Sequence, residues 1–450
     1  MSRLSIGSRE GAATRLARSA AGMAAVAVVA ALVSACSSGG HSSLPAGEGS
    51  AGEASSAKHP ASTTTTTVGP HFTISPGDGT AGADPSAGIT VTASDATLTN
   101  VTVQTAGDPV SGALSQGNTV WHSQGTLDVS QSYKVTATGV RPGGRTVTSV
   151  STFHTLTPTK TFRTEIFEGT NQTYGVGMPI ILYFNQHIVD KAAVEQALQV
   201  TTSKPVVGAW YWDDPCNMAT TCAYFRPRDY WPADTTVSFT GHLDGVQGAP
   251  GVYGTYTLSQ TFKIGPSLVA VGNTATHRTQ IYQDGKLLYN WPISSGRPGD
   301  DTPDGSYLTI DKHNPVQMVG PGYNISVPWS VRFTWSGDYY HDAYWSVGQQ
   351  GFQNVSHGCV NLAPADAQIY YGLAVPGDPI TIVGSPVAGT WDNGWTEWFL
   401  SWDQYLKGSA LHEAVVAGPS GSNFVDPASL PPSAATAPLL TSPANNSAAQ

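Results

Sequence analysis

The sequence predicts a protein dominated by antiparallel β-structure, with little helix. Charged residues make up only 12% of the chain, and 49 glycines and 31 prolines interrupt it. Short segments rich in β-branched and aromatic residues alternate polar and apolar side chains, and they recur about every 10–15 residues between turn residues. This pattern is typical of β-sandwiches and not of helical bundles. The length of 450 residues is sufficient for about three domains.

The N-terminal segment, residues 1–35, has the pattern of an export signal. Several arginines precede a run of small apolar residues, "SAAGMAAVAVVAALVSA". The run ends in "LVSAC", which resembles the lipobox of bacterial lipoproteins. That resemblance implies that Cys36 is lipidated and begins the mature chain, which would anchor the protein to the cell membrane, facing the periplasm or cell wall. A plain secretory signal with a chance cysteine, or a retained anchor, is the alternative.

Residues 36–70 are predicted to form a flexible tether. The segment consists mostly of Gly, Ser, Thr and Ala and shows no periodic apolar pattern. Such residues bury too little surface to offset the entropy that folding costs the chain. The tether would hold the folded part of the protein away from a membrane.

Two β-sandwiches of the immunoglobulin-like kind are expected to follow, over residues 71–158 and 159–264. In the first, segments such as "GITVTASD" and "SYKVTATG" alternate and end at Gly, Asp or Pro. The first sandwich carries no acid/base pair and no cysteine, so it is interpreted as a spacer. The second sandwich contains strand patterns such as "PIILYFNQ" and "KPVVGAWYWDD" and one short helical stretch, "DKAAVEQAL".

Two cysteines of the second sandwich are predicted to form a disulfide. Cys216 and Cys222 flank a turn-like stretch, "NMATT". In an exported chain this spacing favours a hairpin disulfide over a metal pair, which would need two further ligands nearby. With Cys36 assigned to lipid, Cys359 remains unpaired. An unpaired cysteine in an exported protein is a candidate reactive thiol.

A third β-rich domain is expected over residues 265–385, followed by two C-terminal segments. Eight of the 12 tryptophans lie from Trp291 onward, which indicates an aromatic core or the wall of a groove. Four of these eight tryptophans lie close together within residues 386–408, and their spacing fits one face of a short helix. This extension is predicted to pack on the third domain as a clasp, with a sugar-stacking surface as the alternative. Residues 409–450 are Ala/Pro/Ser-rich and are predicted to be disordered.

The third domain contains a thiol that follows two potential bases in the sequence. Cys359 follows His357 and Gly358 in the stretch "SHGCVN", and His341 lies upstream. A cysteine nucleophile needs a base or a cation nearby to generate the thiolate. The residues alone leave three interpretations open: a thiol enzyme, a metal site, or a structural cysteine. The spacing is unusual for zinc, and no nearby acidic cluster supplies a fourth ligand.

The stretch "SHGCVN" resembles the signature of the L,D-transpeptidases, the family with the YkuD-type catalytic domain. That signature is Ser/Thr-His-Gly-Cys-apolar-Asn with a further His upstream, and here residues 342–355 separate His341 from Ser356. The sequence "TPDGSY" also resembles a Thr-Pro-x-Gly turn of the family. The order of lipobox, tether, two immunoglobulin-like domains and catalytic domain is similar to mycobacterial and related actinobacterial members. The resemblance covers roughly residues 70–405.

The resemblance implies roles for individual residues and requires no metal or cofactor. Cys359 would be the nucleophile, and His341 would be its base or the imidazolium partner of a preformed thiolate. The N–H groups of Gly358 and Cys359 would form the oxyanion hole beside His357, assisted by the Tyr323 hydroxyl. The resemblance assigns substrate binding or order of the site to Tyr323, Met318, Ser356, Asn361 and Trp345. Close relatives often have serine at the position of Asp342, which would orient His341 through its backbone or shift the pKa of His341 through its carboxylate.

The resemblance also implies substrates and inhibitors. The donor would be a peptidoglycan stem tetrapeptide, attacked at the carbonyl of its third residue with release of D-alanine. The amine of a diamino acid on a second stem would then resolve the thioester as a 3→3 cross-link. Carbapenem β-lactams would acylate the same cysteine. The alternatives are an L,D-carboxypeptidase or a non-catalytic wall-binding spacer. Nucleic acid is excluded as a partner, because the net charge is −10 and no basic cluster is present.

Overall fold

The computed structural model describes residues 72–216, 219–320 and 322–432. The predicted signal peptide, the lipidated Cys36 and the tether lie outside these residues. Strands dominate the described chain, and its three α-helices are short: α1 (Lys191–Gln196), α2 (Pro364–Leu373) and α3 (Trp402–Leu406). The predicted fold class is therefore confirmed. No helix in the described ranges is long and apolar enough to cross a membrane.

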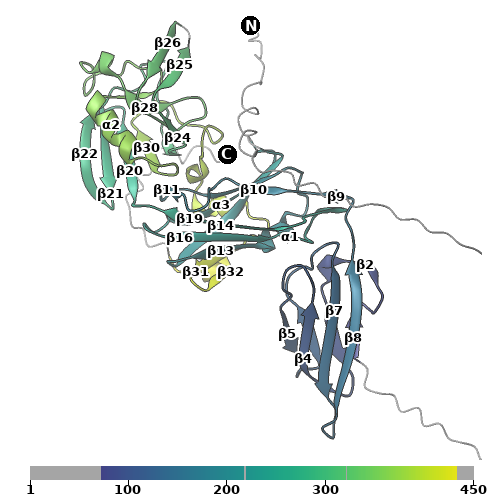
Figure 1. The fold of residues 1–450 in the computed structure, drawn as a ribbon. Helices are drawn as coiled ribbons and strands as arrows, with labels where there is room; N and C mark the ends of the chain where they lie inside the picture. Colours follow the sequence, from purple (N-terminus) through teal and green to yellow (C-terminus); the bar gives the residue numbers. More distant parts are fainter. Residues whose placement is uncertain (1–71, 217–218, 321, 433–450) are drawn as a thin grey trace, which may run out of the picture. The chain divides into compact units, whose positions relative to one another are not determined.

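The first domain is a β-sandwich of two four-stranded sheets (Figure 1). One sheet has the order β1 (Phe72–Ser75), β3 (Thr90–Ala93), β6 (Val120–Ser123), β5 (Gly112–Ser115). The other has the order β2 (Ala81–Ala83), β8 (Thr146–Thr155), β7 (Ser132–Val140), β4 (Thr97–Gln104). Alternate residues of β7 are buried, so Tyr133, Val135 and Ala137 enter the core where Trp121 and Phe153 also lie.

The second domain is also a sandwich, and its larger sheet contains six strands. Their order is β10 (Thr164–Ile166), β12 (Ile180–Phe184), β15 (Thr221–Pro227), β14 (Val206–Asp213), β31 (Ala414–Gly418), β32 (Gly421–Val425). The facing sheet has the order β11 (Thr173–Tyr174), β19 (Thr257–Ile264), β16 (Thr236–His242), β13 (Leu198–Thr202). A small third sheet has the order β17 (Gln247–Ala249), β18 (Val252–Tyr253), β9 (Lys160–Thr161). Trp210, Phe225 and Phe239 are fully buried in this core.

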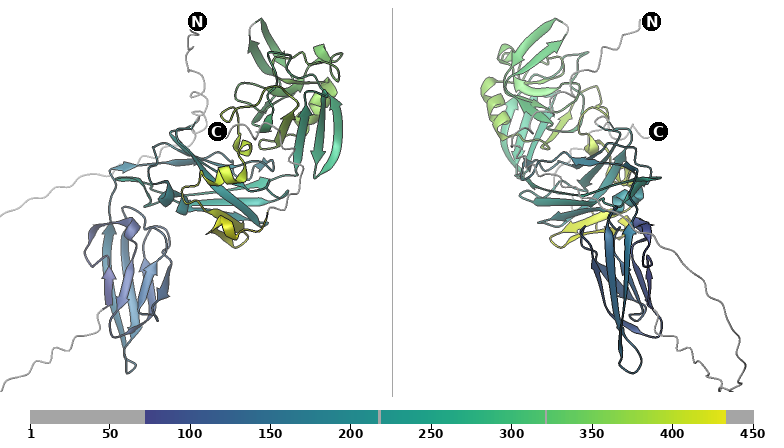
Figure 2. Two further views of the ribbon diagram at one scale, coloured as in Figure 1. Left: turned by 180° about the vertical axis from the view of Figure 1, so that it is seen from behind. Right: turned by 45° about the vertical axis from the view of Figure 1, so that its right-hand side comes forward.

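The C-terminal hairpin β31–β32 corrects the prediction of disorder from residue 409. β31 pairs antiparallel with β14, with Val206 opposite Ala417, and so the chain returns to the second sandwich after the third domain. Figure 2 shows this yellow hairpin beside the teal strands of that sandwich. Val415 is only 2% exposed, because the short apolar run "AVVAG" finds a partner strand far away in the sequence. Composition could not show that partner; residues 433–450 lie outside the described part.

The Trp-rich segment is not one helix, and its packing differs from the predicted clasp. A 3₁₀ turn (Glu397–Phe399) and the separate helix α3 divide it. Trp395 and Trp398 belong to the core of the second sandwich, and the Trp398 indole N–H donates to Gly177 O at 2.8 Å. The Phe399 ring packs on Tyr307 of the third domain, with ring centroids 5.1 Å apart. The segment therefore joins the two domains because its aromatic residues face both.

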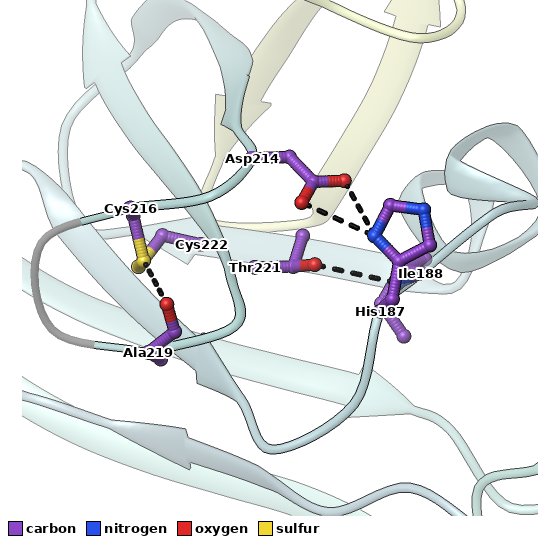
Figure 3. Close-up of a disulfide and its surroundings, with 7 residues drawn as sticks. All are labelled: His187, Ile188, Asp214, Cys216, Ala219, Thr221 and Cys222. Carbon is purple, nitrogen blue, oxygen red and sulfur yellow. Dashed lines mark hydrogen bonds and ion pairs between the residues drawn. A yellow bond between two sulfur atoms is a disulfide. The ribbon is translucent and has the colours of Figure 1, made fainter.

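The predicted disulfide between Cys216 and Cys222 is confirmed. The two Cα atoms are 5.8 Å apart, and Cys222 lies fully buried on β15 (Figure 3). Beside it, the Asp214 carboxylate lies 3.1 Å from His187 Nδ1 and forms an ion pair with Lys191 at 3.1 Å. The bridge therefore closes the loop between β14 and β15, two strands whose antiparallel pairing already brings their ends together.

Removal of this disulfide is expected to lower the free energy of unfolding by about 2 kcal/mol, the loop-entropy value for so short a closure. The variant is Cys216→Ser with Cys222→Ala, because a serine hydroxyl at the buried position 222 would lose its hydrogen bonds to water. Denaturant unfolding measures the loss, and wild-type protein with dithiothreitol is the matched control. Iodoacetamide labelling of both cysteines in unreduced, denatured wild type would contradict the bridge.

The third domain packs a five-stranded sheet against a second, four-stranded sheet. The first has the order β22 (Lys286–Pro292), β21 (Arg278–Gln283), β20 (Leu268–Asn273), β30 (Pro379–Val383), β23 (Gly305–Leu308). The second has the order β24 (Asp311–His313), β27 (Ser330–Arg332), β28 (Tyr339–Asp342), β29 (Val360–Leu362). A hairpin of β25 (Val316–Gly320) and β26 (Tyr323–Val327) extends from this domain (Figure 1). Ile281, Phe333, Tyr340 and Leu362 fill the core between the sheets.

Candidate active site

The parallel pairing of β28 with β29 brings the two halves of the motif together. His341 lies opposite Asn361, and Cys359 immediately precedes β29. The Cys359 Sγ reaches the start of β28, where it contacts Gly337 O at 3.7 Å and receives a hydrogen bond from the Tyr339 N–H. Residues two apart along a strand share a face, so Tyr339 and His341 point to the same side. Cys359, at the start of β29, and His341, on β28, therefore lie on neighbouring strands of this sheet.

Cys359 is the free cysteine of the described residues and is partly exposed. Burial of its sulfur raises the pKa of the thiol to about 12, and the negative charge of Asp338 raises it further. The hydrogen bond from the Tyr339 N–H opposes this shift. The resting group is therefore a neutral thiol, whose proton is directed toward Gly337 O.

His341 is buried, with 3% of its surface exposed, and is held in one tautomer. Its Nδ1 lies 2.8 Å from Asp342 O, and because a carbonyl oxygen only accepts, Nδ1 carries the proton. Nε2 is then the nitrogen that can accept a proton. Burial lowers the pKa of His341 to about 4, although the hydrogen bond to Asp342 O favours the charged form. Of the two predicted arrangements, this favours a neutral base over a preformed imidazolium–thiolate pair.

The Asp342 carboxylate does not contact the imidazole. Its Oδ1 accepts a hydrogen bond from the Tyr344 N–H at 3.1 Å, and only the backbone carbonyl of Asp342 orients His341. Burial, opposed by that N–H, raises the pKa of the carboxyl group. Of the two possibilities for this departure from the family pattern, the structure favours the backbone role.

The Asp342→Ser variant is therefore expected to show a pH profile of Cys359 acylation that superimposes on that of the wild type, within about twofold in rate. A serine hydroxyl can accept the same bond from the Tyr344 N–H, and the carbonyl toward His341 is unchanged. Stopped-flow acylation by a β-lactam from pH 4 to pH 10 measures both profiles. A displaced profile for the variant would show that the carboxylate does act on His341.

The loop "SHGC" is tied down by its own serine. The Ser356 hydroxyl donates to Cys359 O at 2.6 Å and accepts from the Gly358 N–H at 3.1 Å. The Gly358 N–H, expected in the oxyanion hole, is therefore already engaged. Ser356 is only 8% exposed and orders the loop, and its contact with a substrate stays a prediction. The serine's position in the motif did not reveal which groups its hydroxyl would bind.

Gly358 is required by both its backbone and its neighbour. Its φ is +125°, and a Cβ added there would lie 2.5 Å from Asp338 Oδ1. Thr302 Oγ1 donates to Gly358 O at 2.6 Å, which ties the "TPDGSY" turn to the motif loop. A side chain at position 358 would both strain the backbone and displace the carboxylate.

The hairpin β25–β26 brings Tyr323 to the motif loop. The rings of Tyr323 and the exposed His357 are 5.1 Å apart, and the Tyr323 ring covers Gly320, its partner across the hairpin. Met318 pairs with Ile325, so it shares a hairpin face with Tyr323. Tyr323 therefore lies beside the motif loop, and the contact of Tyr323 and Met318 with a substrate remains a prediction.

Asn361 and Trp345 both lie near His341. Asn361 is buried, and its side chain donates to Ser346 Oγ at 2.9 Å, so in this structure it orders the adjacent 3₁₀ turn (Tyr344–Ser346). The same turn carries Trp345, which is 46% exposed and lies 5.9 Å from the His341 ring. Trp345 therefore remains available to a ligand, whereas Asn361 does not.

Asp338 is a residue of this site that the sequence did not identify. Its Oδ2 accepts from Thr334 Oγ1 at 2.8 Å and from Ser336 Oγ at 3.4 Å, while Oδ1 faces Gly358. Burial raises the pKa of this carboxyl group. A single acid within "WSGDYYH" matches no spacing rule, and only the fold places it beside the thiol.

Family models match both parts of the chain. The model described as L,D-transpeptidase catalytic domain, YkuD, matches residues 267–382, which include Cys359 and His341. The model described as bacterial Ig domain matches residues 80–247, across the first and second sandwiches.

Relatives of known name cover most of the chain. L,D-transpeptidase 5 of Mycobacterium tuberculosis is 34% identical over 314 residues, which are 68% of this chain and 69% of the relative. L,D-transpeptidase 2 of the same species is 31% identical over 335 residues, 72% of this chain and 80% of the relative. A solved L,D-transpeptidase in complex with imipenem is 31% identical and covers 50% of this chain and all of its own, with a TM-score of 0.42. With relatives that match both the motif-bearing domain and the sandwiches before it, the chain belongs to the L,D-transpeptidases, a family of acyltransferases.

Proposed function

We propose that this protein forms 3→3 cross-links in peptidoglycan through a thioester on Cys359. The observation that carries the proposal is the pairing of β28 with β29, which sets a neutral, partly exposed thiol on the strand neighbouring that of His341, a buried base whose Nδ1 is fixed on Asp342 O. That arrangement leaves the Nε2 lone pair to accept the thiol proton, as general-base catalysis requires. Family membership supports the reaction class.

The first half-reaction releases D-alanine. Cys359 Sγ attacks the carbonyl carbon of the third residue of a stem tetrapeptide, and His341 Nε2 takes the thiol proton. The tetrahedral oxyanion is held by the Cys359 N–H and the Tyr323 hydroxyl, since the Gly358 N–H is bound to Ser356. His341 then gives its proton to the departing amine, and a thioester remains.

The second half-reaction decides between two activities. The amine of a diamino acid on a second stem attacks the thioester, which forms the cross-link and returns the thiol. Attack by water would instead make the protein an L,D-carboxypeptidase. The exposed rings of Trp345, which lies beside His341, and of its neighbour Tyr344 favour the first outcome, because they offer apolar surface to a second peptide.

Inhibition and location belong to the same proposal. A relative has been solved with imipenem, and we infer that carbapenems acylate Cys359 here too. Lipid on Cys36 would anchor the chain to the cell membrane, with the tether carrying the folded domains toward the wall.

Intact-protein mass spectrometry tests the proposed function. Incubation with a stem tetrapeptide is expected to add the mass of the stem minus D-alanine to Cys359, and a second stem is expected to discharge it as a cross-linked dimer. Adduct followed only by hydrolysis would establish the carboxypeptidase. Turnover that is abolished by a chelator and insensitive to a thiol alkylator would replace the thioester with a metal mechanism.

A further inference from the structure

A carboxylate beside a thiol nucleophile opposes the chemistry of the thiol. Asp338 Oδ1 lies against the Cα of Gly358, the residue immediately before Cys359, at the place where a Cβ would come within 2.5 Å of it. A negative charge there disfavours the thiolate, because two anions in a partly buried site repel each other. The position of the Asp338 carboxylate therefore has to be explained by an interaction other than its effect on the thiol of the resting enzyme.

No cation of the described residues neutralises Asp338. None of the ion pairs found in those residues includes it. Arg332 is the nearest positive charge acting on it, but the guanidinium is committed to Thr334 O at 2.9 Å and Trp335 O at 2.6 Å. The Asp338 carboxylate accepts hydrogen bonds from the Thr334 and Ser336 hydroxyls, both at Oδ2. The Oδ1 atom, directed toward the thiol loop, has no cationic partner.

The substrates of the proposed reaction carry the missing charge. A diamino acid has a primary ammonium group in the donor stem, near the carbonyl that Cys359 attacks. The acceptor stem carries one as well, which gives a proton to His341 Nε2 before the resulting amine attacks the thioester. An ammonium on Asp338 Oδ1 would neutralise the carboxylate and at the same time favour the thiolate, since the repulsion between the two anions would be removed.

We propose that Asp338 is the binding residue for a primary ammonium group of the stem peptide, placed beside the nucleophile so that a cationic substrate completes the charge balance of the site. This rests on the proposed function. The residue acts by contact with the substrate, and its carboxylate is held in place by the Thr334 hydroxyl. Substrates or inhibitors without an ammonium gain nothing from it.

The test compares the wild type with Asp338→Asn, which keeps the shape and an oxygen for Thr334 but removes the charge. Asp284→Asn is the matched control, because it removes one negative charge from an exposed turn between β21 and β22 of the same domain. Thermal unfolding and acylation by a β-lactam without a cationic group are measured for all three proteins. A retained melting temperature in Asp338→Asn, with acylation at least as fast as in the wild type, shows that the fold and the thiol are intact, because loss of the negative charge favours the thiolate.

Two arms distinguish the source of the ammonium. In the donor arm, D-alanine release is compared for a tetrapeptide with a free side-chain amine and for the same peptide N-acetylated there. In the acceptor arm, the preformed acyl-enzyme is mixed with an amine acceptor, and the ratio of transfer to the amine over hydrolysis by water is measured. Asp338→Asn is expected to lose about tenfold or more of the wild-type preference in one arm, the order expected when a hydrogen bond between charged groups is lost.

Each outcome decides the matter. Loss in the donor arm assigns the donor side chain, and loss in the acceptor arm assigns the acceptor amine. Unchanged preference in both arms, with an intact fold, overturns the role of Asp338 and leaves the proposed function standing. A wild type that releases no D-alanine from either tetrapeptide overturns the proposed function itself, and this inference with it.

Discussion

Replacement of Cys359 by alanine is expected to abolish D-alanine release and acylation by carbapenems, a loss of more than about a thousandfold. The proposed mechanism has one nucleophile, and an alanine methyl group can form no thioester. The fold should persist with a change within about 0.5 kcal/mol in the free energy of unfolding, because the thiol is partly exposed and donates only one long hydrogen bond, to Gly337 O at 3.7 Å. D-alanine assays and intact-protein mass spectrometry measure the effect.

The double variant at Cys216 and Cys222 is the matched control for the loss of a sulfur. That bridge lies in the second sandwich, so its removal should lower stability and leave the acylation of Cys359 unchanged. A folded Cys359→Ala protein that still released D-alanine at the wild-type rate would disprove the thioester mechanism.

Replacement of His341 by glutamine is expected to slow acylation about 10²–10⁴-fold, the usual contribution of a positioned general base. Glutamine can replace the hydrogen bond to Asp342 O but has no atom that takes a proton at neutral pH. Single-turnover acylation by a carbapenem isolates this step.

The role of His341 as a base also predicts the direction in which the acylation rate of the wild type changes with pH. The folded pKa of His341 is about 4, below its ordinary value, because burial disfavours the cation. The imidazole is therefore neutral and able to accept a proton above about pH 4, and it becomes protonated and inactive as the pH falls through 4. The wild-type rate should decline only in that acid range, and His341→Gln should lack this decline. A wild-type decline near pH 6.5 instead would show that burial does not control this histidine.

Local sequence patterns predicted the strands, the disulfide and the two central residues of the candidate site. Alternating segments such as β7 bury one face of a sheet and therefore show a period of two in the sequence. The Cys216–Cys222 pairing followed from a short turn between two cysteines. His341 and Cys359 could be associated because a motif spacing links them, and the fold brings them together through the β28–β29 ladder.

The remainder depended on contacts between distant segments. The partner of β31 is β14, and nothing in the composition of the C-terminal segment names that strand. Asp338 approaches Gly358 only because two strands pair in parallel. The Gly358 N–H donates to the Ser356 hydroxyl, because a buried backbone donor needs an acceptor. The motif alone does not say which acceptor that N–H has. In each case the missing information is a tertiary partner.

The return of the chain to β14 has a consequence for biosynthesis and truncation. Residues 206–208 must wait for residues 415–417, so the larger sheet of the second sandwich closes only after the whole third domain has emerged during synthesis or export. Until then β14 is an open edge whose unpaired N–H and C=O groups can recruit another chain. A chain that ends at residue 408 keeps every residue of the thiol site but leaves that edge permanently open. β31 and β32 therefore cover the edge of β14 against pairing with another chain, although they lie in a different domain from the thiol site.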